Sequence, residues 1–158
     1  MLFRSGRPEL AVRSTWTAFK VSAAYMLFFA AIFVILPDLI LMPFKAFSDP
    51  DDFAALRDPV VELLRFVAVY CFFDAMVIVF SFAIRGAGDT RFALLFSCVI
   101  AWTVMVLPTW ISIKWFGGGL HACWWFCTIY IIVLGIGFFA RFQAGHWKSM
   151  RVIEAAPK

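Results

Sequence analysis

Charge is what this 158-residue sequence has least of: 15% of its residues are charged, against about 25% in soluble domains. Histidine occurs only twice, and no histidine, cysteine or acid falls at a spacing that suits catalysis or zinc. A nucleotide loop is also missing, because Gly86–Ala87–Gly88 follows a long apolar run and not a strand. We therefore expect no enzymatic activity and no cofactor. The net charge of +4 is too small and scattered to suggest nucleic acid as a partner.

Apolar residues are correspondingly abundant in this sequence. They make up 64% of the chain, against about 45–50% in ordinary soluble domains, and the mean hydropathy is +0.91. Four runs are long enough to cross a bilayer, so the sequence predicts an all-α, polytopic membrane bundle with four transmembrane helices. We place the spans at residues 16–44, 59–84, 92–113 and 120–140, with a basic tail at 141–158. The cysteines lie inside these runs and are interpreted as apolar packing residues.

Prolines and aspartates predict where these helices begin and end. Pro37 is expected to kink or end the first helix, because proline lacks the N–H that a helix interior needs. Asp58 and Pro59 look like the cap and first turn of the second span. Either Asp89 or Thr90 is expected to cap the third span.

An acidic segment precedes the second span. Four aspartates lie between residues 48 and 58, but their spacing is not that of a calcium loop. We interpret the segment as a solvated loop with a short helix that begins near Pro50.

Basic residues indicate the membrane topology. Ten of them lie in the N-terminal segment, the connection between the second and third spans, and the tail. Four lie on the other side, beside most of the acids. The positive-inside rule therefore predicts that both termini are cytoplasmic. A bacterial plasma (inner) membrane is the location that the family resemblance given below implies.

One acid lies inside an apolar run. Asp74 is at the middle of residues 66–84, where Tyr70 and Ser81 are the only other polar side chains. A carboxylate at the bilayer centre costs roughly 2.5–3.5 kcal/mol, so we interpret Asp74 as a cation-coupling residue that binds Na⁺ or H⁺. The alternative is a structural carboxylate that is hydrogen-bonded to a neighbouring helix. Tyr70 and Ser81 share its helical face and are weaker candidates, and no other metal site is expected.

Several motifs resemble one family. The run Ile84–Arg85–Gly86–Ala87–Gly88–Asp89–Thr90–Arg91 resembles the Leu-Arg-Gly-Ala-Gly-Asp-Thr motif of multidrug and toxic compound extrusion (MATE) transporters. Many bacterial members carry an acid eleven residues before the arginine of that motif, which is where Asp74 lies. The run Gly119–Leu120–His121–Ala122–Cys123–Trp124 resembles the start of the family's last span, with alanine where a glycine is usual. The segment that begins at Arg141 resembles its C-terminal ending, and residues 6–13 weakly resemble the link before its ninth span.

The resemblance implies that this chain is the last four of twelve spans, a partial C-terminal lobe. Such antiporters export cationic and lipophilic drugs in exchange for Na⁺ or H⁺, so the implied partners are the bilayer, the ion, drug-like cations and the missing N-terminal helices. Met1 would then be an internal methionine or the start of a truncated gene. The motif residues implied to form a structural or gating loop are Arg85, Gly86, Gly88, Asp89 and Thr90. The alternative is a small four-helix membrane protein that acts as an oligomeric channel or a structural subunit.

Cysteine-accessibility labelling in intact cells tests the topology. Single cysteines near Asp52 and Gly118 should react with an impermeant reagent from outside, and those near Gly88 and Met150 only from inside, because basic residues are retained in the cytoplasm. The reverse pattern would contradict the charge argument.

Overall fold

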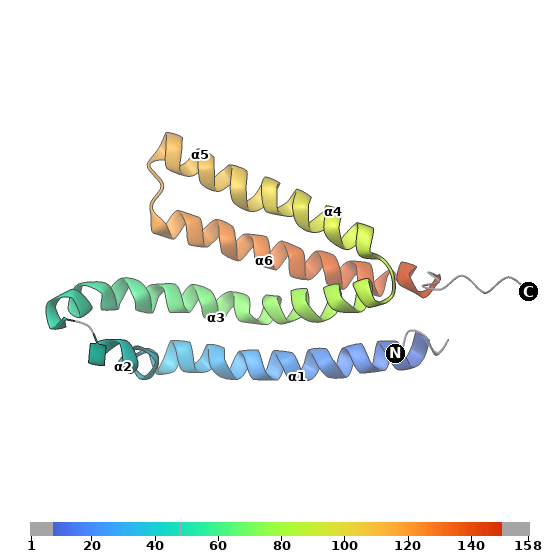
Figure 1. Ribbon diagram of the computed structural model, residues 1–158, viewed down its shortest axis with the longest axis horizontal. Coiled ribbons are helices and arrows are strands. Elements are labelled where there is room, and N and C mark those ends of the chain that lie inside the picture. Colours follow the sequence, from blue (N-terminus) through green and yellow to red (C-terminus); the bar gives the residue numbers. More distant parts are fainter. Residues whose placement is uncertain (1–7, 48, 150–158) are drawn as a thin grey trace, which may run out of the picture.

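Helices account for all the regular secondary structure in the part of the chain that the computed structural model describes, residues 8–47 and 49–149. Four long rods cross the molecule, and together they make an all-α integral membrane protein (Figure 1). The helices are α1 (Pro8–Ile35), α2 (Pro37–Phe47), α3 (Pro50–Gly86), α4 (Thr90–Ile100), the π-helical segment η2 (Ala101–Val106), α5 (Leu107–Phe116), α6 (Leu120–Gln143) and the 3₁₀ turn η3 (His146–Ser149).

Four stretches are long and apolar enough to span a membrane, which confirms the number of spans expected from the sequence. They are Glu9–Ile35, Phe53–Gly86, Thr90–Phe116 and Leu120–Gln143. The first span ends at Ile35, short of the predicted limit at residue 44, because Pro37 begins a separate helix. The other three helices extend beyond the apolar limits that we predicted at one or both ends, because a helix can continue into the polar headgroup region without losing its internal hydrogen bonds.

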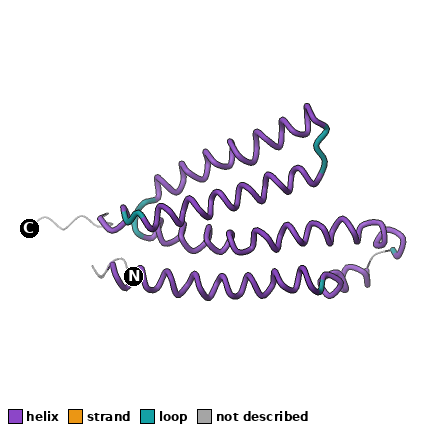
Figure 2. The backbone as a smooth tube through the Cα atoms, turned by 180° about the vertical axis from the view of Figure 1, so that it is seen from behind, coloured by secondary structure: helices purple, strands orange, loops and turns teal. Residues whose placement is uncertain are grey.

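The rods lie in the order α1, α3, α6 and then α4–η2–α5, with α3 and α6 in the middle (Figures 1 and 2). Helix α3 makes the most extensive contacts, with α6 on one side and α1 on the other. The start of α1, the α3–α4 turn and the end of α6 lie at the same end of the bundle (Figure 1). The α2–α3 junction and the connection at 117–119 lie at the opposite end (Figure 1). We call these the turn end and the far end.

The hydrophobic core is concentrated at the turn end. Its central rings and aliphatic chains are Phe80 and Ile84 from α3 with Leu134, Phe138 and Phe142 from α6, all fully or nearly fully buried. Phe80 also contacts Trp16 and Phe19 of α1, so three of the four rods meet around this one side chain. The far end has few buried side chains, and there the rods separate (Figures 1 and 2).

The predicted cap at Asp58–Pro59 is wrong. Helix α3 begins at Pro50 and continues through Pro59 without interruption. Proline removes one helical hydrogen bond and crowds the preceding turn, but the rest of a 37-residue helix holds the backbone in register. The break expected at Pro37 is confirmed, since α1 ends at Ile35 and α2 begins at Pro37.

The turn between α3 and α4 depends on a glycine. Gly88 has a φ of +101°, in the region that side chains avoid. The Asp89 N–H donates to the Ile84 carbonyl at 3.1 Å, and the Gly88 N–H donates to the Arg85 carbonyl at 3.0 Å. This is the Schellman arrangement, which satisfies carbonyls at the end of a helix. The glycines of the Gly86–Ala87–Gly88 run therefore end α3 and lead the chain into α4.

The caps of the other helix ends differ in detail from those expected. Asp89 occupies the N-cap position of α4, as predicted, but its side chain makes no capping hydrogen bond. Helix α5 continues past Lys114 to Phe116, and Gly117 ends it with a φ of +64°. Helix α6 reaches Gln143, so the start of the predicted tail is helical.

Gly135 allows α6 to lie directly against α3. A Cβ atom at this position would lie 2.9 Å from the backbone oxygen of Phe73, which cannot move without moving the helix. Overpacking of this kind costs about 1–3 kcal/mol, which exceeds the helix-propensity gain of about 1 kcal/mol from alanine. Gly135→Ala should therefore lower the thermal unfolding temperature of the purified protein in detergent.

Gly119→Ala is the matched control for this substitution. Nothing lies within 4 Å of a Cβ at Gly119, and alanine there loses only the capping preference of glycine at the start of α6. This variant should therefore unfold closer to the wild-type temperature than Gly135→Ala. Equal stability of the two variants would contradict the close approach of the helices.

Candidate functional site

Asp74 lies on α3 and is half-buried. Among the described residues, no side chain or backbone group forms a hydrogen bond or ion pair with its carboxylate. The structural alternative, a hydrogen bond to a neighbouring helix, is therefore not seen within residues 8–47 and 49–149. A charged carboxylate is costly within a membrane span, so Asp74 is a candidate cation-binding residue.

Three side chains precede Asp74 at four-residue intervals along the same face of α3, and each contacts α6. Glu62 forms an ion pair with His121, with 2.8 Å between Oε2 and Nε2. Phe66 meets Trp125 edge to face, with 5.2 Å between ring centroids. We call Glu62, Phe66, Tyr70 and Asp74 the α3 column.

Tyr70 is the third member of the column. Its ring is nearly parallel to that of Trp124, with an interplanar angle of 9° and 6.3 Å between centroids. Asp74, one turn further toward the turn end, is the first member without a partner on α6 among the described residues. The column therefore places an aromatic pair immediately beside the unpaired carboxylate.

Ser81 is less well placed to act with Asp74. It lies seven residues away, about 10 Å along the helix axis, and it is buried. Its hydroxyl donates to the carbonyl of Ile78 on the same helix, at 3.3 Å. The structure thus brings Tyr70 next to Asp74 and leaves Ser81 bonded elsewhere.

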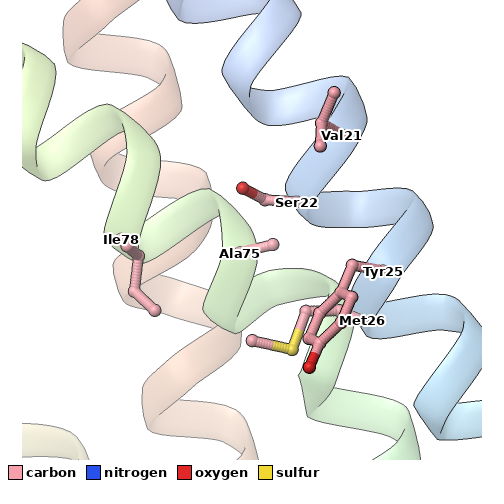
Figure 3. A pocket seen from close by; sticks show the side chains of 6 residues that line it. All are labelled: Val21, Ser22, Tyr25, Met26, Ala75 and Ile78. Atoms are coloured by element: carbon pink, nitrogen blue, oxygen red, sulfur yellow. The ribbon is translucent and has the colours of Figure 1, made fainter.

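A small crevice lies beside the column, on the side of α3 that faces α1. Ser22 and Tyr25 of α1 face Ala75 and Ile78 of α3 across it (Figure 3). The complete lining is Val21, Ser22, Tyr25, Met26, Ala75 and Ile78. Asp74 is not part of this lining, because consecutive residues of a helix point about 100° apart. The crevice is therefore apolar and separate from the carboxylate.

Asp89 differs from Asp74, because it is buried and is paired with a cation. Asp89, in the α3–α4 turn, accepts a hydrogen bond from Nε of Arg141 at 2.9 Å, and Nη2 of the same arginine lies 2.8 Å from the same oxygen. The Asp89 side chain is only 7% exposed and that of Arg141 is 24% exposed. The guanidinium also lies over the ring of Phe92, 4.5 Å from its centroid, an arrangement that adds a cation–π attraction.

This ion pair joins two segments that sequence reasoning kept apart. The predicted roles were a helix cap for Asp89 and a basic tail for Arg141, and nothing in the sequence alone pairs residues 52 positions apart. The residues of the predicted motif loop have different positions and contacts in the structure. Gly86 and Gly88 shape the turn, Thr90 begins α4, and Asp89 carries the ion pair. Arg85 is exposed, with its guanidinium over Phe82 at 5.7 Å.

Comparison with known proteins gives a consistent result. The family model MatE matches residues 4–111. A protein named "Probable multidrug resistance protein NorM" in Pseudomonas putida is 28% identical over 134 residues, which is 85% of this chain and 28% of the relative. Its namesake in Deinococcus radiodurans is 28% identical over 138 residues, or 87% of this chain and 30% of the relative.

A third relative with the same name, from Mesorhizobium japonicum, is 28% identical over 100 residues, which is 63% of this chain and 21% of the relative. The chain thus spans less than a third of the length of the curated relatives that it matches. No solved structure matches it significantly.

The buried ion pair should contribute more to stability than any exposed pair. Asp89→Asn or Arg141→Gln leaves the other charge buried and unpaired, which costs about 3 kcal/mol. We expect each single variant to lower the free energy of unfolding in a detergent titration by about this amount. The double variant should lose less than the sum of the single losses, because the two residues interact.

Arg57→Gln provides the matched control. Arg57 pairs with Asp38 at 2.8 Å, but both side chains are exposed, and exposed pairs contribute less than about 1 kcal/mol. Additive losses in the Asp89 and Arg141 double variant would contradict a direct pair.

Proposed function

Because the chain belongs to the MatE family, we propose that it forms part of a cation-coupled antiporter that exports cationic or lipophilic compounds in exchange for Na⁺ or H⁺. Family membership is supported by the match over residues 4–111 and by the relatives named as multidrug resistance proteins. In this proposal the chain is a membrane transport component with no catalytic role. Its partners are the bilayer, the coupling ion, the substrate and further helices of a larger transporter.

The observation that carries the proposal is the difference between the half-buried Asp74 and the buried Asp89. Asp89 is held by Arg141 and has no free charge to exchange. Asp74 lies mid-span with no cationic group bound among the described residues. A coupling residue has to gain and lose a cation in each cycle, which requires a carboxylate that no permanent positive charge already neutralises.

The surroundings of Asp74 suit such an exchange. Tyr70 offers a hydroxyl and an aromatic face one helical turn away, and aromatic faces attract cations. Trp124 fixes the orientation of the Tyr70 ring by stacking on it. Ser81 has its hydroxyl directed to Ile78, so in this proposal it supports the helix more than the ion.

The motif loop has a structural role in the proposal. Carriers of this kind alternate access by moving rigid groups of helices about a central site. The Schellman turn at Gly88 and the ion pair between Asp89 and Arg141 hold α3, α4 and α6 together at the turn end. These residues would thus keep Asp74 in a fixed position while the lobe moves.

Cation exchange at Asp74 can be tested on the chain itself. In lipid nanodiscs, infrared difference spectra recorded between low and neutral pH, and with and without Na⁺, should contain a carboxyl band that disappears in Asp74→Asn. Asp58→Asn is the matched control, because Asp58 lies on the same helix but its side chain is 87% exposed. Identical spectra for wild type and Asp74→Asn would contradict a coupling role.

Transport requires a second experiment. We expect a chimera in which this chain replaces the matching part of the Pseudomonas putida relative to perform ion-driven drug efflux. Asp74→Asn should abolish the efflux while leaving membrane insertion intact, since the substitution preserves size and removes the exchangeable charge. Coupled efflux by the purified 158-residue chain alone would instead favour the oligomeric four-helix alternative.

A further inference from the structure

The span from Thr90 to Phe116 is not one uniform α-helix. Its middle six residues, Ala101–Val106, form the π-helical segment η2, and the N–H of Leu107 donates to the carbonyl of Trp102, five residues back. A π segment is rare, and when it interrupts an α-helix it widens the backbone locally and frequently marks a functional position. The other three spans contain no π segment within the part of the chain that the structure describes.

The sequence explains why the interruption occurs here. Pro108 is the second residue after η2 and cannot donate to the carbonyl of residue 104, and its ring would crowd that carbonyl in a regular α-helix. Just before this point the hydroxyl of Thr103 donates to the carbonyl of Val99, at 2.8 Å. Hydroxyl groups that bond in this way tend to bend a helix. Two independent features therefore weaken the same turn.

Proline alone does not produce this effect in the chain. Pro59 lies inside α3 and Pro43 inside α2, and both of these helices remain α-helical. The combination of Pro108 with the Thr103 hydroxyl bond and a π segment thus distinguishes this span from the other proline-containing helices.

The half of the span before η2 is anchored. The rings of Phe92 and Phe96 stack on each other, and Phe96 contacts Phe138 of α6 at 5.4 Å between centroids. Gly137 of α6 leaves room for the Phe96 ring, because a Cβ there would overlap it. The ion pair between Asp89 and Arg141 closes the end of this half.

The half after η2 is held much less firmly. No residue of α5 is buried, and Trp110, Trp115 and Phe116 are largely exposed. In both views α5 diverges from α6 toward the far end (Figures 1 and 2). The connection that follows is three consecutive glycines, at 117–119, which resist movement less than any other residue type.

We propose that η2 is a hinge, about which α5 moves as a rigid arm relative to α4 and α6. The chain bends at η2, and α4 stays fixed because it is packed against α6. The glycine connection at 117–119 allows α5 to move without displacing α6. The hinge is a property of this span and does not rest on the proposed transport function.

Hydrogen exchange measured by mass spectrometry in lipid nanodiscs tests the hinge. Residues 127–135 of α6 are as far along the chain from the 117–119 connection as residues 101–109, so they provide a depth-matched reference. A hinge opens its hydrogen bonds more often than a packed helix, and we expect residues 101–109 to exchange at least about tenfold faster than this reference and than residues 92–99. Equal protection in the three segments would overturn the proposal.

A proline replacement is the second part of this experiment. Pro108→Ala restores the missing donor and should slow exchange in residues 101–109 by about tenfold, without changing residues 92–99. Pro59→Ala is the matched control and should leave exchange in residues 101–109 unaltered. If Pro108→Ala leaves the fast exchange unchanged, η2 is not a proline-dependent hinge and the proposal fails. The wild-type comparison remains decisive even if this variant does not fold.

Discussion

The close approach of α3 and α6 is the contact on which the rest of the structure depends. In a bilayer, apolar side chains gain little by leaving lipid, so helices associate through tight packing and polar contacts. Gly135 permits that packing by bringing α6 against the backbone of Phe73. Phe80 and Phe138 then fill the interface at the turn end. Helix α1 covers the other side of α3, and α4 covers α6, so both outer rods take their positions from this central pair.

The two aspartates in this framework differ in burial and in pairing. Asp89 and Arg141 satisfy each other, and Phe92 covers the guanidinium. Such a pair stabilises the turn, and its carboxylate is already bound by the guanidinium. Asp74 is on the most central helix, where packing holds the backbone firmly, yet its carboxylate has no partner among the described residues. The coupling role proposed for Asp74 depends on this unpaired carboxylate and on the firmly held backbone around it.

Rigidity is unevenly distributed along the rods. The turn end combines the apolar core with the Asp89 ion pair and the Schellman turn. The far end has few buried side chains, and the ion pair between Glu62 and His121 there is exposed. Within its span, segment η2 lies between the packed turn end and the loosely packed far end. A weakened turn can exist there without disrupting the fold, because most of the core lies toward the turn end.

The sequence by itself determined that the chain is a four-span helical membrane protein, because hydropathy and length suffice when lipid excludes every unpaired backbone group. It also singled out Asp74 as an acid inside an apolar run, since a charge among apolar residues is a local signal. Only the tertiary structure decided that α3 continues through Pro59, since helix continuity depends on the whole helix and not on one residue. It also decided that Arg141 takes the side chain of Asp89 away from its capping role. That pairing depends on where two distant segments meet in space, and no local pattern of residues encodes it.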